Sequence, residues 1–212
     1  MRPVNPQQTL RHEALRLHQR YQRELIERFS VCPWAKAARV QGRSRAYVVT
    51  NETCSVDELV PVLADWADDE TVDVAFVIAP RFTGGPDELA AWASAIAEQR
   101  DGVFLTAPFY PSAPGSAGSI QFLRQTPDPT VQLVRRSLLE QIRSQDPPHY
   151  RDMFDIDLEN LEAMKPPQSV AASVVAHNER TLEREGRAEI QRILDDIRGD
   201  RERSYARVMG LF

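Results

Sequence analysis

The sequence contains few lysines, no surplus of positive charge and no long apolar run, and each shortage excludes a class of protein. Only two of its 212 residues are lysines, Lys36 and Lys165, and its formal net charge is −5. A chain with this charge does not attract a phosphate backbone or an anionic lipid surface, so we expect neither nucleic acid nor membrane as a partner. No segment approaches the roughly 18–20 consecutive apolar residues of a membrane span.

Cysteine is also scarce, with Cys32 and Cys54 as the only two thiols. Two cysteines do not make the disulfide framework of small secreted proteins, and the first residues lack the apolar stretch of a signal peptide. The sequence therefore predicts a cytoplasmic protein with both thiols reduced. It has no glycine-rich phosphate loop and no HExxH, CxxC or GxSxG motif, so generic motifs do not identify a reaction.

Hydrophobic periodicity in the first half predicts an α/β fold. Apolar residues at spacings of three and four predict a long helix over residues 5–29. Beyond it, we expect strands and helices to alternate, with strands at 46–49, 72–79 and 103–107 and helices at 55–68 and 84–99. This order predicts a small, mainly parallel β-sheet with right-handed helical crossovers.

A long connection follows the third predicted strand. Residues 108–128 are rich in Pro, Gly and Ser, and within them only 119–123 could be a strand. Asp128-Pro129 is a capping residue followed by proline, a combination that predicts the start of a helix over 131–143.

The C-terminal part has a helical pattern. We expect a short helix near 157–164 and further helices over 169–209, with Gly186 as a joint. The whole chain, 1–212, is predicted to be a single α/β domain with additional N- and C-terminal helices, and residues 169–209 are expected to form a C-terminal helical extension packed on it.

The long connection also holds the first candidate site. In open parallel sheets, ligands bind beyond the carboxyl ends of the strands, where the loops diverge and helix N-termini point. The connection brings Tyr110, Arg124 and Thr126 to this edge, just before the predicted helix start at Asp128. An arginine beside unpaired backbone N–H groups binds a carboxylate or a phosphate. The alternative is that Arg124 is a surface arginine and Tyr110 a packed aromatic.

Cys32 is the stronger candidate of the two thiols. It precedes a predicted short helix over 33–39, and the N-terminus of this helix together with Lys36 would stabilise a thiolate as nucleophile or metal ligand. A buried thiol that only fills space is the alternative. Cys54 has no nearby cation, and we expect it to be such a residue.

The histidines form no metal-binding pattern. His12 and His18 are six residues apart and do not share a helix face, so we expect both to be exposed. His149 lies in a connection after two prolines. His177 precedes Asn178 in an apolar helical run, where a core or interface histidine is expected.

Four segments in order resemble one known family. They are the sequence VCPWAK at 31–36, and residues 102–111, 124–135 and 178–186. Over about residues 12–186 the chain resembles the DUF1415 family, a widespread bacterial domain of unknown function. The resemblance implies that Cys32 and Pro33 belong to a site together with the loop after the third strand and the segment that begins at Arg124. It implies no reaction.

One position departs from the family pattern. The family has Phe-His-Pro where this chain has Phe109-Tyr110-Pro111. Whether Tyr110 replaces a functional histidine of the relatives is left open, since tyrosine is a poorer base near pH 7 but can donate a proton.

The first functional hypothesis is a small-molecule enzyme with an anionic substrate. Cys32 is its nucleophile or redox thiol, and Tyr110 is its proton donor. The substrate would be bound by Arg124, Thr126, Asn178 and His177.

Two further hypotheses remain beside it. In one, the Cys-Pro motif makes Cys32 a thiolate ligand of a metal or haem, with Trp34, Phe109 and Phe122 lining the haem pocket. In the other, the protein is a non-catalytic binding module whose arginine-rich late helices dock a partner protein, although alternating charges more often mark a solvated face.

Overall fold

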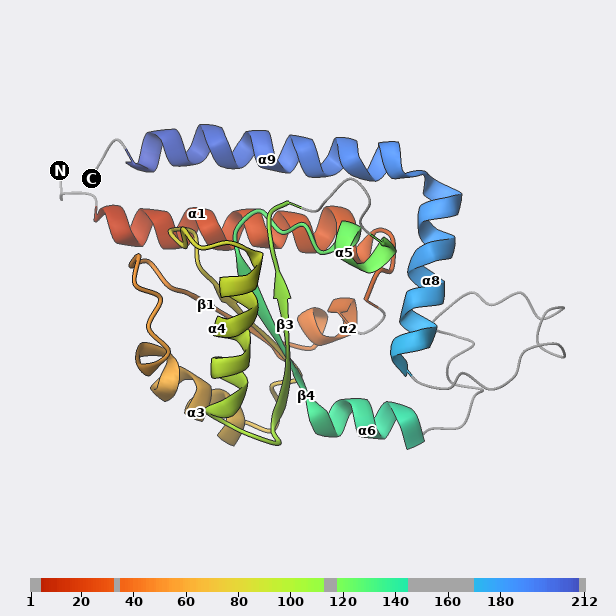
Figure 1. The fold of residues 1–212 in the computed structure, drawn as a ribbon, viewed down its shortest axis with the longest axis horizontal. Helices are drawn as coiled ribbons and strands as arrows, with labels where there is room; N and C mark the ends of the chain where they lie inside the picture. The colour runs from red at the N-terminus through yellow and green to blue at the C-terminus, as the bar shows by residue number, and fades with distance from the viewer. Residues whose placement is uncertain (1–4, 33–34, 113–117, 145–169, 210–212) are drawn as a thin grey trace, which may run out of the picture.

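The computed structural model describes residues 5–32, 35–112, 118–144 and 170–209 (Figure 1). Its centre is a four-stranded sheet with helices packed on both faces, so the predicted α/β class is confirmed. The strands are β1 (Ser44–Val48), β2 (Val74–Ile78), β3 (Phe104–Phe109) and β4 (Thr130–Arg135).

The sheet is mixed, and the prediction of a mainly parallel sheet is wrong. The strand order is β1-β2-β4-β3, and only β1 and β2 are parallel. Strand β4 lies between β2 and β3 and is antiparallel to both. The last of the described strands is therefore inserted between two earlier ones.

Strand β4 explains the error, because its residues were predicted to begin a helix. Asp128-Pro129 resembles a helix start, but Thr130 and Val131 after it are β-branched, and β4 pairs with a strand on each side. The helical pattern appears only afterwards, as α6 (Arg136–Ser144). The one segment of the connection predicted as a strand is instead the short helix α5 (Ser119–Leu123).

The N-terminal helix is confirmed. Helix α1 (Pro6–Tyr21) begins at Asn5, whose side-chain Oδ1 accepts a hydrogen bond from the backbone N–H of Gln7 at 3.0 Å. It continues into a π-helical segment, η1 (Gln22–Glu27), which is followed by the short helix α2 (Ala35–Val40).

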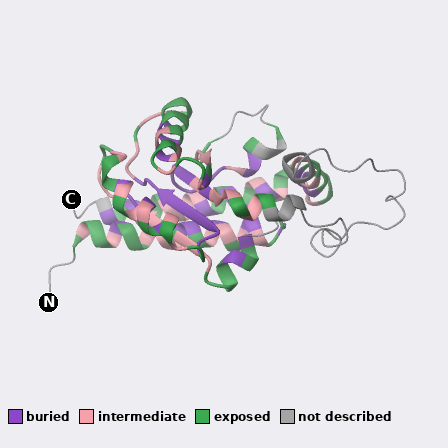
Figure 2. Ribbon diagram, turned by 90° about the horizontal axis from the view of Figure 1, so that it is seen from below, coloured by how far each residue is buried: buried purple, intermediate pink, exposed green. Residues whose placement is uncertain are grey.

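Helices cover the two faces of the sheet differently. Alternate residues of β2 point to opposite faces. On one face, Ala75 and Val77 pack against α3 (Val60–Asp68), which follows a 3₁₀ turn at Asp57–Leu59, and against α4 (Pro86–Glu98). On the other face, Phe76 packs with α1 and α2. Every residue of β2 is buried, and Figure 2 shows the buried positions concentrated in the sheet and on the inner sides of the helices.

The C-terminal helical pattern is also confirmed. Helices α8 (Val170–Glu185) and α9 (Arg187–Met209) are joined at Gly186, whose φ of +82° is readily adopted only by glycine. Helix α9 runs alongside α1 (Figure 1), and Leu17 shares a buried cluster with Tyr205.

Two further predictions concern a helix at 157–164 and membrane-spanning segments. The predicted helix at 157–164 lies outside the described residues, as do Pro33, Trp34 and His149. Among the helices that the structure describes, none combines the length and the apolar character needed to cross a membrane.

Candidate functional site

A cavity of about 130 Å³ lies between α1, η1, α8 and the sheet face that α1 covers. Its walls combine apolar side chains, such as Ile26, Phe76 and Leu123, with polar ones. The polar lining comes from His18, Cys32, Arg124, Thr126, Gln132 and Asn178.

Four of the six predicted site residues meet at this cavity. Cys32 follows η1, Arg124 and Thr126 lie in the loop before β4, and Asn178 lies on α8. These segments are distant in the sequence, so the fold is what brings them together. Tyr110 and His177 are not part of the lining.

The backbone around Cys32 has two uncommon features. The chain leaves α1 through the π-helical segment η1, a conformation that is rare and frequently found at functional sites. Ser30 then has a φ of +52°, which is unusual for a residue with a side chain. The N–H of Val31 donates a hydrogen bond to the carbonyl of Ile26 at 2.9 Å. Together they turn the chain back, so that Val31 and Cys32 line the cavity.

The predicted helix-dipole effect on Cys32 stays a prediction. The described part of helix α2, Ala35–Val40, begins three positions after Cys32, and the two residues between them lie outside the described residues. The position of Cys32 in the cavity, and not a helix N-terminus, marks it as a candidate.

Arg124 is a partly buried cation at the same cavity. Its guanidinium lies over the Phe109 ring, 5.1 Å from the ring centroid. Within the part of the chain that the structure describes, no carboxylate lies within ion-pairing distance of it. Burial lowers the pKa of this guanidinium, because the charged form is poorly solvated there. A partly buried arginine without a counter-ion favours an anionic ligand.

The helix N-terminus predicted beside Arg124 does not exist, because β4 begins there. Asp128 has another role: its buried carboxylate accepts hydrogen bonds from Arg201 Nε and the Tyr205 hydroxyl, both at 2.7 Å. Burial raises the pKa of Asp128. The Thr126 hydroxyl donates to the carbonyl of Asp128 at 2.7 Å, so Thr126 holds the loop that carries Arg124.

His18 is a site residue that the sequence reasoning missed. It is buried rather than exposed, with its ring 4.5 Å from that of Phe76 and 6.5 Å from that of Tyr21. Burial lowers its pKa to about 4, so the imidazole is neutral at pH 7. The signal was present: His18 lies four residues after Ala14 and three before Tyr21, both on the buried face of α1.

Tyr110 and His177 lie outside the cavity lining. The Tyr110 hydroxyl donates to the carbonyl of Gly84 at 3.1 Å, and its ring packs against the core on the α3 and α4 side of the sheet. His177 is half-buried on α8, and burial lowers its pKa while its contacts with the backbone of Ser30 and Phe29 oppose the shift. His177 therefore supports the segment that leads to Cys32.

The described cavity gives no support to the haem of the second hypothesis. An apolar cavity of about 150 Å³ holds a single benzene ring, and the cavity here is about 130 Å³. A tetrapyrrole is several times larger. Of the three predicted haem-contacting aromatics, only Phe109 lines it; Phe122 packs under Arg187, and Trp34 lies outside the described residues. Over the described ranges, no group of three or more His, Cys, Asp or Glu could hold a metal ion.

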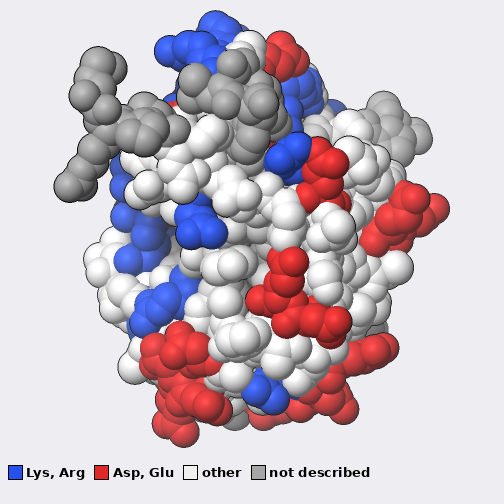
Figure 3. All heavy atoms as spheres, turned by 90° about the vertical axis from the view of Figure 1, so that its left-hand side faces the viewer, with Lys and Arg blue, Asp and Glu red and all other residues white. Residues whose placement is uncertain are grey.

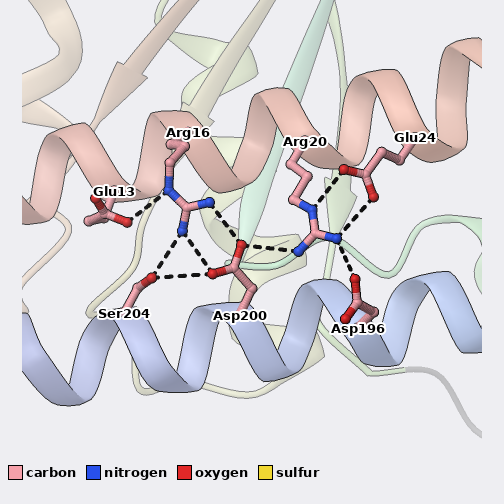
Figure 4. A network of polar contacts seen from close by, with 7 residues as sticks. All are labelled: Glu13, Arg16, Arg20, Glu24, Asp196, Asp200 and Ser204. Carbon is pink, nitrogen blue, oxygen red and sulfur yellow. Dashed lines mark hydrogen bonds and ion pairs between the residues drawn. The ribbon is translucent and has the colours of Figure 1, made fainter.

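Helix α1 is fixed in place by a charge network with α9 (Figure 4). Asp200 accepts hydrogen bonds from Arg16 at 2.8 Å and Arg20 at 3.0 Å, and Arg20 also pairs with Glu24 and Asp196. These arginines hold the pKa of Asp200 down, at about 2. His18 lies between the two arginines in the sequence, so the network also holds the helix turn that carries it.

Several charges on the late helices pair within the molecule. Arg192 pairs with Glu189, Arg198 with Asp195, and Arg201 with Asp128. At the end of the molecule where the chain termini lie, side chains of both signs occur on the surface (Figure 3).

Comparison of the chain with protein-family models, with curated proteins and with solved structures finds no match. The resemblance to the DUF1415 family therefore stays a prediction. The chemistry of the cavity is what remains to indicate a function.

Proposed function

We propose that the protein is a small-molecule enzyme that binds an anionic substrate in the cavity, with Cys32 as nucleophile and Arg124 as the anchor of the negative group. One observation carries the proposal: Cys32 and a partly buried arginine with no carboxylate partner among the described residues line the same cavity. The DUF1415 resemblance supports it, because the resembling segments include both residues.

The cavity limits the size and character of the substrate. At about 130 Å³ it accepts a group the size of one ring or a short branched acid. Phe76, Ile26 and Leu123 provide an apolar wall for the carbon skeleton, and Arg124 fixes the orientation of the acidic group through paired hydrogen bonds.

Acyl transfer is the reaction class that these residues favour. The Cys32 sulfur attacks the carbonyl carbon of an ester or amide, and the leaving group departs with the proton that the thiol has lost. The acyl group, now a thioester on sulfur, is then taken by water or a second acceptor, and the thiol is restored. Arg124 contributes by holding the substrate in reach of the sulfur, since orientation lowers the barrier.

Two alkylating reagents, one anionic and one neutral, test the site directly. Iodoacetate carries a carboxylate and iodoacetamide does not, although both alkylate thiols. For each thiol we compare the rate of modification by iodoacetate with the rate by iodoacetamide. We expect this rate ratio to be at least tenfold higher for Cys32 than for glutathione, which corresponds to about 1.4 kcal/mol. Cys54 is buried and its pKa is raised to about 11, so it stays unmodified, and peptide mass mapping checks this.

Variants make the test specific. Arg124→Gln removes the preference for iodoacetate and leaves the iodoacetamide rate within a factor of two or so. Arg23→Gln, which removes an exposed arginine from η1, is the matched control and keeps the preference. Equal relative rates for glutathione and for Cys32 would contradict the proposal.

A further inference from the structure

Two more polar residues at the cavity lack the partners that buried groups normally have. His18 and Asn178 are only 5% and 4% exposed, and both line the cavity. Neither ring nitrogen of His18, nor Oδ1 of Asn178, has a hydrogen-bond partner in the part of the chain that the structure describes. Such atoms are rare in folded proteins, and each calls for an explanation.

The two residues approach the cavity from different elements. His18 comes from α1, Asn178 comes from α8, and α8 packs against α5, which leads into the Arg124 loop. A single residue with an unmatched atom could reflect local packing. Two of them on separate helices, at the cavity that also holds an arginine without a carboxylate partner, indicate that a ligand supplies the partners.

The chemistry of the two groups specifies what the ligand must carry. The Oδ1 atom of Asn178 can only accept a hydrogen bond, so its partner must be a donor. A neutral imidazole has one N–H donor and one acceptor nitrogen. A purely hydrocarbon acid would satisfy Arg124 and leave all of these atoms unmatched.

We infer that the ligand is a small carboxylic acid that also bears a hydroxyl, amine or amide group. The carboxylate binds Arg124, and the second polar group donates to Asn178 and hydrogen-bonds with His18. This inference rests on the proposed function, because it uses the same cavity and the same anchor. The cavity volume restricts the acid to one about the size of a single ring.

Three probes of nearly equal size separate the contributions of the two groups. Propionate has the carboxylate alone, lactate has the carboxylate and a hydroxyl, and lactamide has the hydroxyl without the charge. Each is added to the full-length protein at increasing concentration, and the rate of Cys32 alkylation by iodoacetamide measures protection. We expect lactate to give half-maximal protection at about tenfold lower concentration than propionate, and lactamide to protect least.

Asn178→Leu tests the assignment of the second group. In this variant, lactate should need the same concentration as propionate for half-maximal protection of Cys32, and the concentration needed for propionate should not change. Tyr110→Phe, which removes a hydroxyl outside the cavity, is the matched control and should keep the advantage of lactate. Circular dichroism and thermal melting establish that each variant is folded. If Asn178→Leu does not fold, the comparison of the three probes on the unmodified protein still decides the question.

The failures of the two proposals differ. If propionate and lactate protect equally and Arg124→Gln abolishes both effects, the second polar group is refuted and the anionic site stands. If neither acid protects Cys32 at any concentration, the anionic site itself is refuted. Equal protection by lactate and lactamide would likewise refute the role of Arg124.

Discussion

At the scale of single residues, the cavity is lined in part by polar groups that have no hydrogen-bond or ion-pair partner among the described residues. Arg124 is partly buried without a carboxylate among the described residues, and His18 is buried as a neutral ring. Asp128 shows the contrast, because its carboxylate is more deeply buried but is matched by Arg201 and Tyr205. Matched polar groups hold the fold, and the unmatched ones that line the cavity are the groups from which we infer a ligand.

Replacement of Cys32 by serine should abolish the chemistry and keep the fold. Serine has nearly the same size, but its hydroxyl is far less nucleophilic than a thiolate at neutral pH. We expect turnover of short-chain acid esters bearing a hydroxyl or amide group to fall at least a hundredfold in Cys32→Ser, with the melting temperature within a few degrees of the original. Retained turnover in this variant would show that Cys32 only fills space. Cys54→Ser is the control and should remain active.

Replacement of His18 by leucine should not destabilise the protein at pH 7. The change removes two ring nitrogens that have no described partner, and burial of an unmatched polar group costs about 1–3 kcal/mol. The loss of the ring contact with Phe76 offsets part of the gain. We therefore expect a free energy of unfolding within about 1 kcal/mol of the original value, measured by urea denaturation. A loss above about 3 kcal/mol would show that the ring has a stabilising partner.

At the scale of elements, the sequence predicted most helices and strands but not how the strands pair. The continuous apolar run of β2 identified a central strand because burial on both faces leaves no polar alternation. Thr130 and Val131 were misread because a capping residue and a proline are local signals, whereas β4 exists through its pairing with two distant strands.

The candidate site was predicted to a similar extent. Cys32 and Arg124 were found from their chemistry, since a thiol near cations and an arginine in a long loop are visible in the sequence. His18 was missed, although its spacing from Ala14 places it on the buried face, because histidine is polar. That these three residues share a cavity depends on long-range packing, which no local pattern encodes.

Helix α9 should loosen when Asp200 loses its charge. Asp200 is the carboxylate that both Arg16 and Arg20 contact, so Asp200→Asn breaks two ion pairs between α1 and α9 (Figure 4). We expect a loss of about 1–2 kcal/mol in the free energy of unfolding and faster amide exchange in α9. Asp195→Asn on the same helix is the control, because its pair with Arg198 is exposed, and we expect less than about 0.5 kcal/mol. Equal effects of the two changes would contradict a special role for Asp200.

At the scale of the whole molecule, His18 should make stability fall between pH 6.5 and 4. Its pKa is about 4 in the folded protein and 6.5 in the unfolded chain, so the unfolded state binds more protons in this range. Stability therefore rises with pH, and about 3 kcal/mol is lost on acidification from pH 7 to pH 4. Asp128 acts in the opposite sense, because burial raises its pKa.

Comparison with His18→Leu isolates this contribution. The leucine variant should lose less stability over the same range, and the difference between the two proteins, measured by urea denaturation at several pH values, should approach the value for His18 alone. Parallel pH profiles would refute the assignment. Below pH 4 both proteins should lose further stability as Asp200, with its pKa of about 2, takes up a proton.

The place of β4 also has a consequence for synthesis on the ribosome. Strands β2 and β3 leave the ribosome before β4, yet the structure pairs each of them with β4 and not with one another. Until Arg135 has emerged, the nascent chain therefore has two hydrophobic strands with open edges, which is the condition under which chains aggregate or recruit chaperones. Completion of the sheet and assembly of the cavity wall at Thr130 and Gln132 then occur in one late step.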